Sequence, residues 1–186
     1  MKLLIFGASG SGTTTLGKAL AMRSDFIHLD VDDYYWVPTT PPYQEKVPLA
    51  ERNTQLSTNF QSNPKVIVSG SMVSWGKEWE TAFDLAVFIR MDNALRMQRL
   101  AQREEERYGE LLRTDPILKE SSAAFLAWAN QYEDPNFTGR SLAVHQQWMQ
   151  KLPFPILQLN GADPLEPKVN EVLQELEKMT QATRKD

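Results

Sequence analysis

The sequence predicts a three-layer α/β fold, in which a five-stranded parallel sheet lies between helices on both faces. Two observations predict it: short, continuous apolar runs recur along the 186-residue chain, and segments with helical spacing separate them. Continuous apolar runs are typical of central parallel strands that are covered on both faces. Strands that alternate with helices favour a doubly wound sheet, because each helix crosses one face and brings the next strand in parallel.

The predicted elements alternate from one end of the chain to the other, which indicates a single domain over residues 1–186. Apolar runs predict strands at residues 3–6, 26–29, 66–69, 85–89 and 156–159. Apolar residues at helical spacing predict helices at residues 14–23, 48–61, 93–108 and 165–179.

Two segments interrupt this alternation. Residues 37–48, VPTTPPYQEKVP, contain four prolines and predict an irregular flap, which together with the following helix spans residues 37–62. Residues 109–140 mix charged and aromatic side chains and contain no convincing strand. They predict either a lid inserted into the domain or a helical hairpin packed on the core.

The composition excludes several classes of protein. A formal net charge of −4 gives no general attraction to nucleic acid or acidic membranes, so neither is an expected partner. The absence of cysteine excludes disulfides and thiolate metal sites and fits a reducing compartment. No apolar run approaches the ~20 residues of a membrane span, and no targeting segment is indicated. We therefore expect a soluble, cytoplasmic protein, whose oligomeric state the sequence does not indicate.

The turn after the first predicted strand is rich in glycine. Residues 7–14, GASGSGTT, match the phosphate-binding spacing G-x-x-x-x-G-K-[ST], except that Thr13 replaces the lysine. Glycines let successive backbone N–H groups point at phosphate oxygens, and the N-terminus of the next helix attracts the same anion. Thr14 falls where a hydroxyl would bind Mg²⁺. The predicted nucleotide-binding residues are Gly7, Ala8, Ser9, Gly10, Ser11, Gly12, Thr13, Thr14 and Thr15.

Thr13 removes a positive charge from the terminal phosphates. One charge-assisted hydrogen bond contributes about 1.5–3 kcal/mol, so its loss weakens nucleotide binding or turnover without abolishing either. Lys18 lies ~7.5 Å further along the predicted helix and points away, so another segment must supply the cation. A dinucleotide-binding turn is an alternative, because Asp30 follows at the end of the second strand. The glycines at positions 7, 10 and 12, however, do not match its G-x-G-x-x-G pattern.

The stretches GASGSGTTTLGKALA and FIHLDVDDYYW resemble the start of the P-loop kinases of nucleotides and small molecules, notably shikimate, gluconate and adenylate kinases. The resemblance implies ATP and Mg²⁺ as cofactors and transfer of the γ-phosphoryl group of ATP to a small-molecule or nucleotide acceptor. It also implies that residues 37–62 form the acceptor-side flap and helix, and that residues 109–140 form a lid.

Four residues are candidates for catalysis: Asp32, Arg99, Arg103 and Arg140. Asp32 matches the second acid of an Asp-x-Asp motif that lies near metal and acceptor hydroxyl in these kinases, so Thr14 and Asp32 are the implied metal residues. Arg99 and Arg103 match the Arg-x-x-x-Arg motif that clamps phosphates, and they share one face of the predicted helix with Arg96 and Arg107. We expect these arginines and Arg140 to supply the charge that Thr13 lacks.

Other residues leave alternatives open. Ser69 ends the third strand where these kinases usually carry an acid, and Gly70 alone remains of their glycine-rich acceptor loop, which argues against shikimate as acceptor. A nucleotide-binding module with weak or no turnover is therefore a second candidate function. Arg52 could bind an acceptor phosphate or lie on the surface. A group of aromatic residues could stack on an acceptor or fill the core: Tyr34, Tyr35, Trp36, Trp75 and Trp79.

Overall fold

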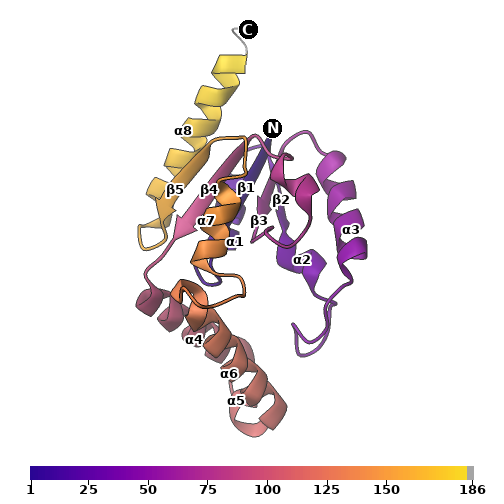
Figure 1. The fold of residues 1–186 in the computed structure, drawn as a ribbon, viewed down its shortest axis with the longest axis vertical. Helices are drawn as coiled ribbons and strands as arrows, with labels where there is room; N and C mark the ends of the chain where they lie inside the picture. The colour runs from indigo at the N-terminus through magenta and orange to yellow at the C-terminus, as the bar shows by residue number, and fades with distance from the viewer. Residues whose placement is uncertain (184–186) are drawn as a thin grey trace.

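The computed structural model describes residues 1–183, and its middle layer is the predicted five-stranded parallel sheet (Figure 1). The strand order is β2-β3-β1-β4-β5. The central strand is β1 (Lys2–Gly7), between β3 (Val66–Ser69) and β4 (Leu85–Arg90). The edges are β2 (Ile27–Asp30) and β5 (Ile156–Asn160).

Helices cover both faces of the sheet, as the sequence predicts. On one face, α1 (Thr13–Met22) and α8 (Leu165–Thr183) pack against the strands. On the other face lie α3 (Leu49–Gln61), α7 (Leu142–Met149) and the short 3₁₀ helix η1 (Lys77–Glu80). Two separate apolar cores result, one on each side of the sheet.

Strand β1 belongs to both cores. Leu3 and Ile5 pack toward α1 and α8, whereas Leu4 and Phe6 pack toward α3 and α7. All four side chains are fully buried. Successive residues of a strand point to opposite faces, so a strand that is covered on both sides needs an unbroken apolar run.

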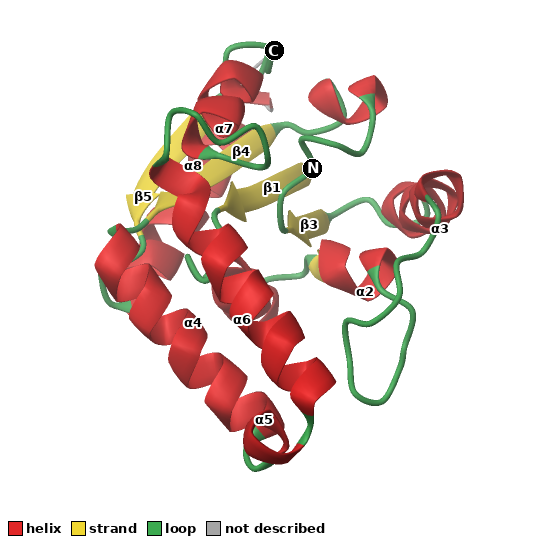
Figure 2. Ribbon diagram, turned by 60° about the horizontal axis from the view of Figure 1, so that its bottom comes forward, coloured by secondary structure: helices red, strands yellow, loops and turns green. Residues whose placement is uncertain are grey.

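Four helical segments lie below the carboxyl ends of the strands (Figure 1). They are α4 (Asn93–Tyr108), α5 (Leu111–Thr114), α6 (Pro116–Asn130) and the 3₁₀ helix η2 (Gln131–Glu133). Helices α4 and α6 lie side by side (Figure 2). Most of the segment predicted as either a lid or a hairpin is therefore helical, and its longest helix, α6, packs against α4.

Helix α2 (Val31–Tyr35) was not expected from the sequence. It forms because the Asp30 carboxylate accepts a hydrogen bond from the Asp32 N–H at 3.1 Å, which caps the first turn and carries the chain directly from strand to helix. Helix α7 and the 3₁₀ helix η1 were also not among the predicted elements. The predicted elements differ only by shifts of one to four residues at their ends; α8, for example, continues to Thr183. No helix within residues 1–183 combines the length and apolarity that crossing a membrane requires.

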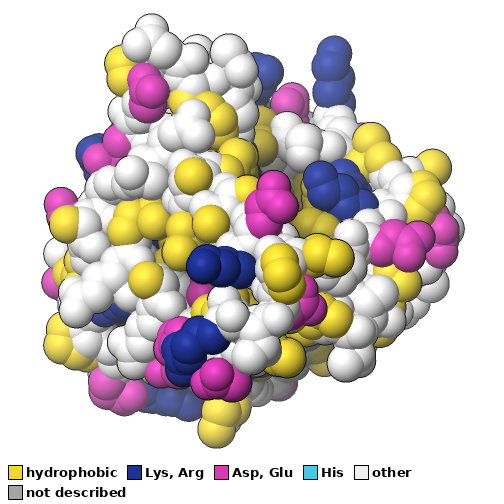
Figure 3. Space-filling view, turned by 90° about the horizontal axis from the view of Figure 1, so that it is seen from below, with side chains coloured by type: hydrophobic (Ala, Val, Ile, Leu, Met, Phe, Trp, Pro, Cys, Tyr) yellow, Lys and Arg dark blue, Asp and Glu magenta, His cyan; other side chains and the backbone are white. Residues whose placement is uncertain are grey.

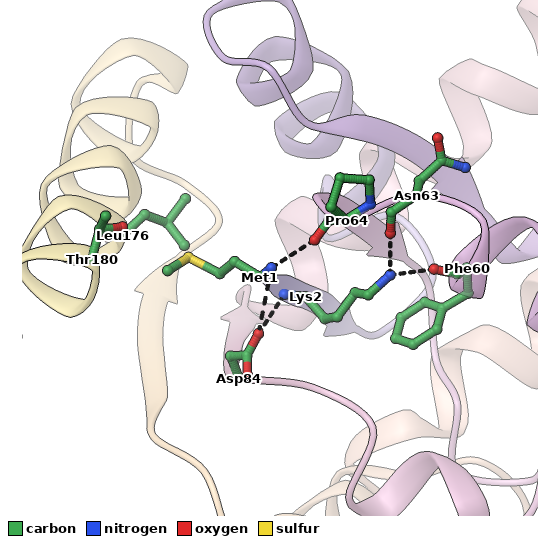
Figure 4. A network of polar contacts seen from close by, with 8 residues as sticks. All are labelled: Met1, Lys2, Phe60, Asn63, Pro64, Asp84, Leu176 and Thr180. Atoms are coloured by element: carbon green, nitrogen blue, oxygen red, sulfur yellow. Dashed lines mark hydrogen bonds and ion pairs between the residues drawn. The ribbon is translucent and has the colours of Figure 1, made fainter. Parts of the chain in front are cut away.

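Charged groups of the first two residues hold the amino end of the sheet (Figure 4). The Lys2 ammonium donates hydrogen bonds to the carbonyls of Phe60 and Asn63, where α3 ends. The Asp84 carboxylate accepts from the Lys2 N–H at 2.6 Å. A cation is favourable at a helix C-terminus, so this network fixes β1 against α3 on the side away from the glycine loop.

Candidate active site

The glycine loop leaves β1 at the carboxyl edge of the sheet and enters α1. Gly10 has φ 84° and Gly12 has φ 99°, left-handed conformations that favour glycine. A Cβ at Gly12 would have no atom of residues 1–183 within 4 Å, so this side of the loop faces open space. The backbone can therefore approach a ligand closely.

Several donors in this loop lack a partner among the described residues, although the Ser11 N–H donates to the Ala8 carbonyl at 3.1 Å. Within residues 1–183, no side chain caps the N-terminus of α1, and the first intrahelical N–H belongs to Leu16, which donates to the Gly12 carbonyl at 3.0 Å. The Ser11 hydroxyl is buried and has no hydrogen-bond partner among the described residues. Orphan donors at a helix N-terminus are a good match for a phosphate group.

A pocket joins this loop to the arginine-bearing face of α4. Its lining on the loop side includes Gly10 and residues 12–15, and its lining on α4 includes Arg99, Leu100 and Arg103. Figure 3 looks onto this end of the molecule and shows Lys and Arg side chains near the middle of the face. The structure thus brings predicted nucleotide-binding residues together with two predicted catalytic arginines.

Arg99 is held by the loop that follows β5. Its guanidinium donates to the Gly161 carbonyl at 3.2 Å and contacts the Met91 sulfur at 3.5 Å. The buried Lys168 ammonium donates to the same carbonyl at 3.1 Å. Gly161 also lies against the glycine loop, because a Cβ there would be 3.0 Å from the Ser11 carbonyl oxygen.

Arg140 reaches the glycine loop from the returning side, as expected. Its guanidinium donates to the Ser9 hydroxyl at 2.8 Å and lies 5.0 Å from the Trp128 ring. Burial lowers the pKa of Arg140 and Asp32 opposes that shift. Arg140 therefore contacts the loop and acts electrostatically on a second predicted catalytic residue.

Asp32 is influenced by charges of both signs. Partial loss of surrounding water raises the pKa of the Asp32 carboxyl although the residue is exposed, and Asp30 adds to the increase, whereas Arg140 and Arg103 lower it. Partial loss of water also lowers the pKa of the exposed Arg103, with Asp32 among the groups that oppose the shift. The carboxylate predicted to face the acceptor thus interacts electrostatically with two of the predicted arginines.

Arg96 differs from the other arginines of α4, because it is only 1% exposed. Its guanidinium donates to the carbonyls of Ser9 at 3.3 Å and Ala129 at 2.9 Å, and lies 5.3 Å from the Tyr132 ring. Arg96 thereby joins the glycine loop to the end of α6. Arg96 precedes the buried Leu100 by four residues and therefore lies on the same face of α4, which is the one feature of the sequence that indicates its burial.

Arg107 lies on the outer end of α4 and contacts the flap. Its guanidinium is 3.0 Å from the Glu104 carboxylate and 4.5 Å from the centre of the Tyr43 ring. The Tyr108 hydroxyl donates to the Pro42 carbonyl at 3.4 Å. The flap over residues 37–48 therefore reaches the lid helices across the carboxyl end of the sheet.

Arg52 is buried, so of the two alternatives left open for it the surface position does not hold. It is 7% exposed, and its guanidinium lies 4.2 Å and 4.8 Å from the ring centres of Tyr35 and Trp75. Among residues 1–183, no group accepts a hydrogen bond from its Nε atom and no carboxylate pairs with it. Trp75 and Trp79 belong to the core, which favours packing over acceptor stacking for both residues.

The residues present fit a magnesium ion that is bound chiefly by a nucleotide. The described residues 1–183 contain no group of three metal-ligating side chains. In phosphoryl-transfer sites Mg²⁺ takes only one or two protein oxygens and completes its coordination with waters and phosphates. Thr14 in the first turn of α1 and Asp32 at the start of α2 could supply such oxygens.

A buried histidine connects three segments around the site. His145 of α7 lies 2.8 Å from the Ser71 hydroxyl through Nε2 and 2.6 Å from the Tyr132 hydroxyl through Nδ1. Burial, with a contribution from Arg140, lowers the pKa of His145 to about 3. The imidazole is therefore neutral and ties the loop after β3 to the end of the lid segment.

These features define the class of protein. The sheet order, the glycine loop after β1 and the arginines that face the loop make this a P-loop kinase-like, nucleotide-binding fold. The order differs from the 3-2-1-4-5-6 order of the dinucleotide-binding fold, which argues against that alternative. A family model described as an AAA domain matches residues 3–117, more than half of the chain, and the chain belongs to this family.

Comparisons with individual proteins agree with this class. The chain is 37% identical over 169 residues to the uncharacterized protein YqaC of Bacillus subtilis (strain 168), covering 91% of this chain and 93% of that protein. It is similar to a shikimate kinase from Bacteroides thetaiotaomicron, with a TM-score of 0.58, 18% identity and coverage of 95% and 98%. A deoxyadenosine kinase from M. mycoides gives a TM-score of 0.54, 14% identity and coverage of 96% and 100%. The two solved structures support the fold alone.

His145 should make folding stability depend on pH. Between pH 6.5 and about 3 the unfolded chain binds a proton that the folded chain resists, so the free energy of unfolding falls as pH decreases. The slope contributed by one such group is at most about 1.4 kcal/mol per pH unit. Urea unfolding from pH 7 to pH 5 should show a shallower dependence for His145→Phe than for the wild type, even though the variant is less stable at pH 7. Equal slopes would contradict this assignment.

Proposed function

We propose that the protein binds ATP with Mg²⁺ and transfers the γ-phosphoryl group to a small acceptor that carries a hydroxyl or phosphate and a further anionic group. The observation that carries the proposal is the pocket in which unpaired donors of the glycine loop face Arg99 and Arg103. Phosphoryl transfer needs positioning and electrostatic stabilisation more than covalent chemistry, and this pocket offers both.

The parts of the site have separate roles under this proposal. The backbone N–H groups of Gly10 and residues 12–15 bind the phosphates, and Thr14 contributes a hydroxyl to Mg²⁺, which would neutralise charge on the phosphates. Arg99, Arg103 and Arg140 stabilise the charge that spreads over the transferred group. Asp32 orients the acceptor hydroxyl and accepts its proton, or holds Mg²⁺ through water.

Arg52 supports an anionic acceptor. A buried guanidinium without a carboxylate partner is costly, and an anionic ligand would offset that cost. The guanidinium of Arg52 lies over the ring of Tyr35. Tyr35 and Asp32 both act electrostatically on Arg140, so Arg52 lies in the same part of the site as Asp32 and Arg140. A carboxylate or phosphate on the acceptor would pair with Arg52.

A nucleotide-binding module with weak or no turnover is the second candidate function. Thr13 and Ser69 favour it, because both replace charged groups that P-loop enzymes use on phosphates and metal. ADP release measured with a panel of anionic and neutral acceptors distinguishes the two. Release that rises with one class of acceptor supports a kinase, whereas nucleotide binding without release under any condition supports the module.

Arg99→Ala should lower kcat for ATP-dependent transfer by about 10³-fold or more, because an arginine at the transferring phosphate contributes that much. Arg113→Ala is the matched control, since Arg113 lies on α5 and its exposed side chain pairs with Glu105 and Glu110. Steady-state rates at saturating ATP give the comparison. An unchanged kcat for Arg99→Ala would contradict the role assigned to Arg99.

Thr13→Lys should leave turnover equal or improved, because it restores the charge that the loop lacks.

Arg52→Met should raise KM for an anionic acceptor by about 10-fold or more while leaving KM for ATP within twofold, since a hydrogen bond to a charged group contributes about 1.5–3 kcal/mol. Methionine keeps the apolar stem between Tyr35 and Trp75. Initial rates as a function of acceptor and of ATP separate the two constants. A parallel rise in both KM values would mean that Arg52 supports the fold and does not bind the acceptor.

A further inference from the structure

Two charges that P-loop enzymes use are both replaced by neutral groups in this chain. In P-loop enzymes a lysine of the loop binds the terminal phosphates, and an acid joins the loop hydroxyl in holding Mg²⁺. Here Thr13 occupies the lysine position and Ser69 occupies the end of β3, where the kinases that the sequence resembles usually carry an acid. The replacement at position 13 removes a positive charge, and the replacement at position 69 removes a negative charge.

Ser69 lies at the same sheet edge as the glycine loop and is completely buried. In the sheet it is in register with Ile5 of β1 and with Asp30 of β2. Its hydroxyl oxygen is 2.8 Å from the Nε2 atom of His28. A neutral side chain at this position is therefore held in one orientation by a specific partner.

Helix α1 packs directly on the His28–Ser69 pair. A Cβ added at Gly17 would lie 2.5 Å from the His28 Nε2 atom and 3.4 Å from the Ser69 Cβ atom. Thr14 precedes Gly17 by three residues and therefore lies on the same side of α1, one turn nearer the loop. The pair thus lies beneath the turn of helix that carries the predicted metal-binding hydroxyl.

The arginines reach the glycine loop from other segments than the His28–Ser69 pair does. Arg99 and Arg103 line the pocket from α4, and Arg140 contacts Ser9 from the segment before α7. Ser69 and His28 approach from the sheet, under α1. On the sheet side, the charged groups that act on His28 are Asp30, Asp33 and Lys18, whereas residues 13 and 69 carry no charge.

We propose that Thr13 and Ser69 form a charge-matched pair: the missing lysine and the missing acid offset one another, and His28 positions the Ser69 hydroxyl to replace the carboxylate beside Thr14. This inference rests on the nucleotide site of the proposed function. A carboxylate at position 69 without a lysine at position 13 would repel the phosphates across a buried, weakly screened distance. A lysine at position 13 without an acid at position 69 would increase the attraction for the phosphates.

The test is a double-mutant cycle with ADP as the probe, measured by calorimetry in EDTA and again with Mg²⁺. In EDTA, Thr13→Lys should bind ADP about 10-fold more tightly than the wild type, and Ser69→Asp about 10-fold more weakly. The double variant should return to within about threefold of the wild type. Thr13→Gln and Ser69→Asn are neutral controls of similar size and should show neither shift.

Two outcomes overturn the pairing: Ser69→Asp that binds ADP like Ser69→Asn, or a double variant no nearer the wild type than the single ones. If Ser69→Asp does not fold, His28→Glu brings a carboxylate to the Ser69 hydroxyl and takes its place in the cycle, with His28→Gln as control. A wild type that binds no ADP overturns the proposed function together with the pairing. A wild type that binds, with single variants that do not shift in opposite directions, overturns the pairing alone.

Discussion

The conformation of the glycine loop is the constraint on which the rest of the site depends. The loop is fixed at Ser9, whose carbonyl accepts from Arg96 and whose hydroxyl accepts from Arg140. It is also confined at Gly10, where a Cβ would lie 2.8 Å from the Leu100 side chain. Contacts from α4 and from Arg140 thus hold a backbone that could not adopt its left-handed turns with larger residues. The unpaired N–H groups of α1 keep their direction because of these contacts.

The arginines of α4 and Arg140 differ in what they contact. Arg96 is buried, and its guanidinium donates to the carbonyls of Ser9 and Ala129, so it stabilises the protein. Arg99 and Arg103 line the pocket, where they face the ligand under the proposed function. Arg140 does both, since it holds Ser9 and acts on Asp32. Under the proposed function, the positive charge that other P-loop proteins place on the loop itself would come from α4 and from Arg140.

The sequence predicted the sheet and the phosphate loop well, because both depend on local patterns. The buried run in β1 and the glycines that follow it define strand, turn and helix with little help from the rest of the chain. The burial of Arg52 had no local signal, since it depends on aromatic rings brought close by folding. The burial of Arg96 had only its spacing from Leu100 as a signal, and the carbonyls that it binds are brought close by folding. Helix α2 was missed for a different reason: a five-residue helix is too short for periodicity, although Asp30 offered a capping signal.

The central claim is that main-chain amides of the loop bind polyphosphate without an ammonium group at position 13. The most direct measurement is a titration of ¹⁵N-labelled protein with ATP and Mg²⁺, followed by amide chemical shifts. The account predicts that the largest shifts fall on residues 10–15, and that NADH at the same concentrations leaves those amides unchanged. Shifts that spare these residues, or that appear equally with NADH, would contradict it.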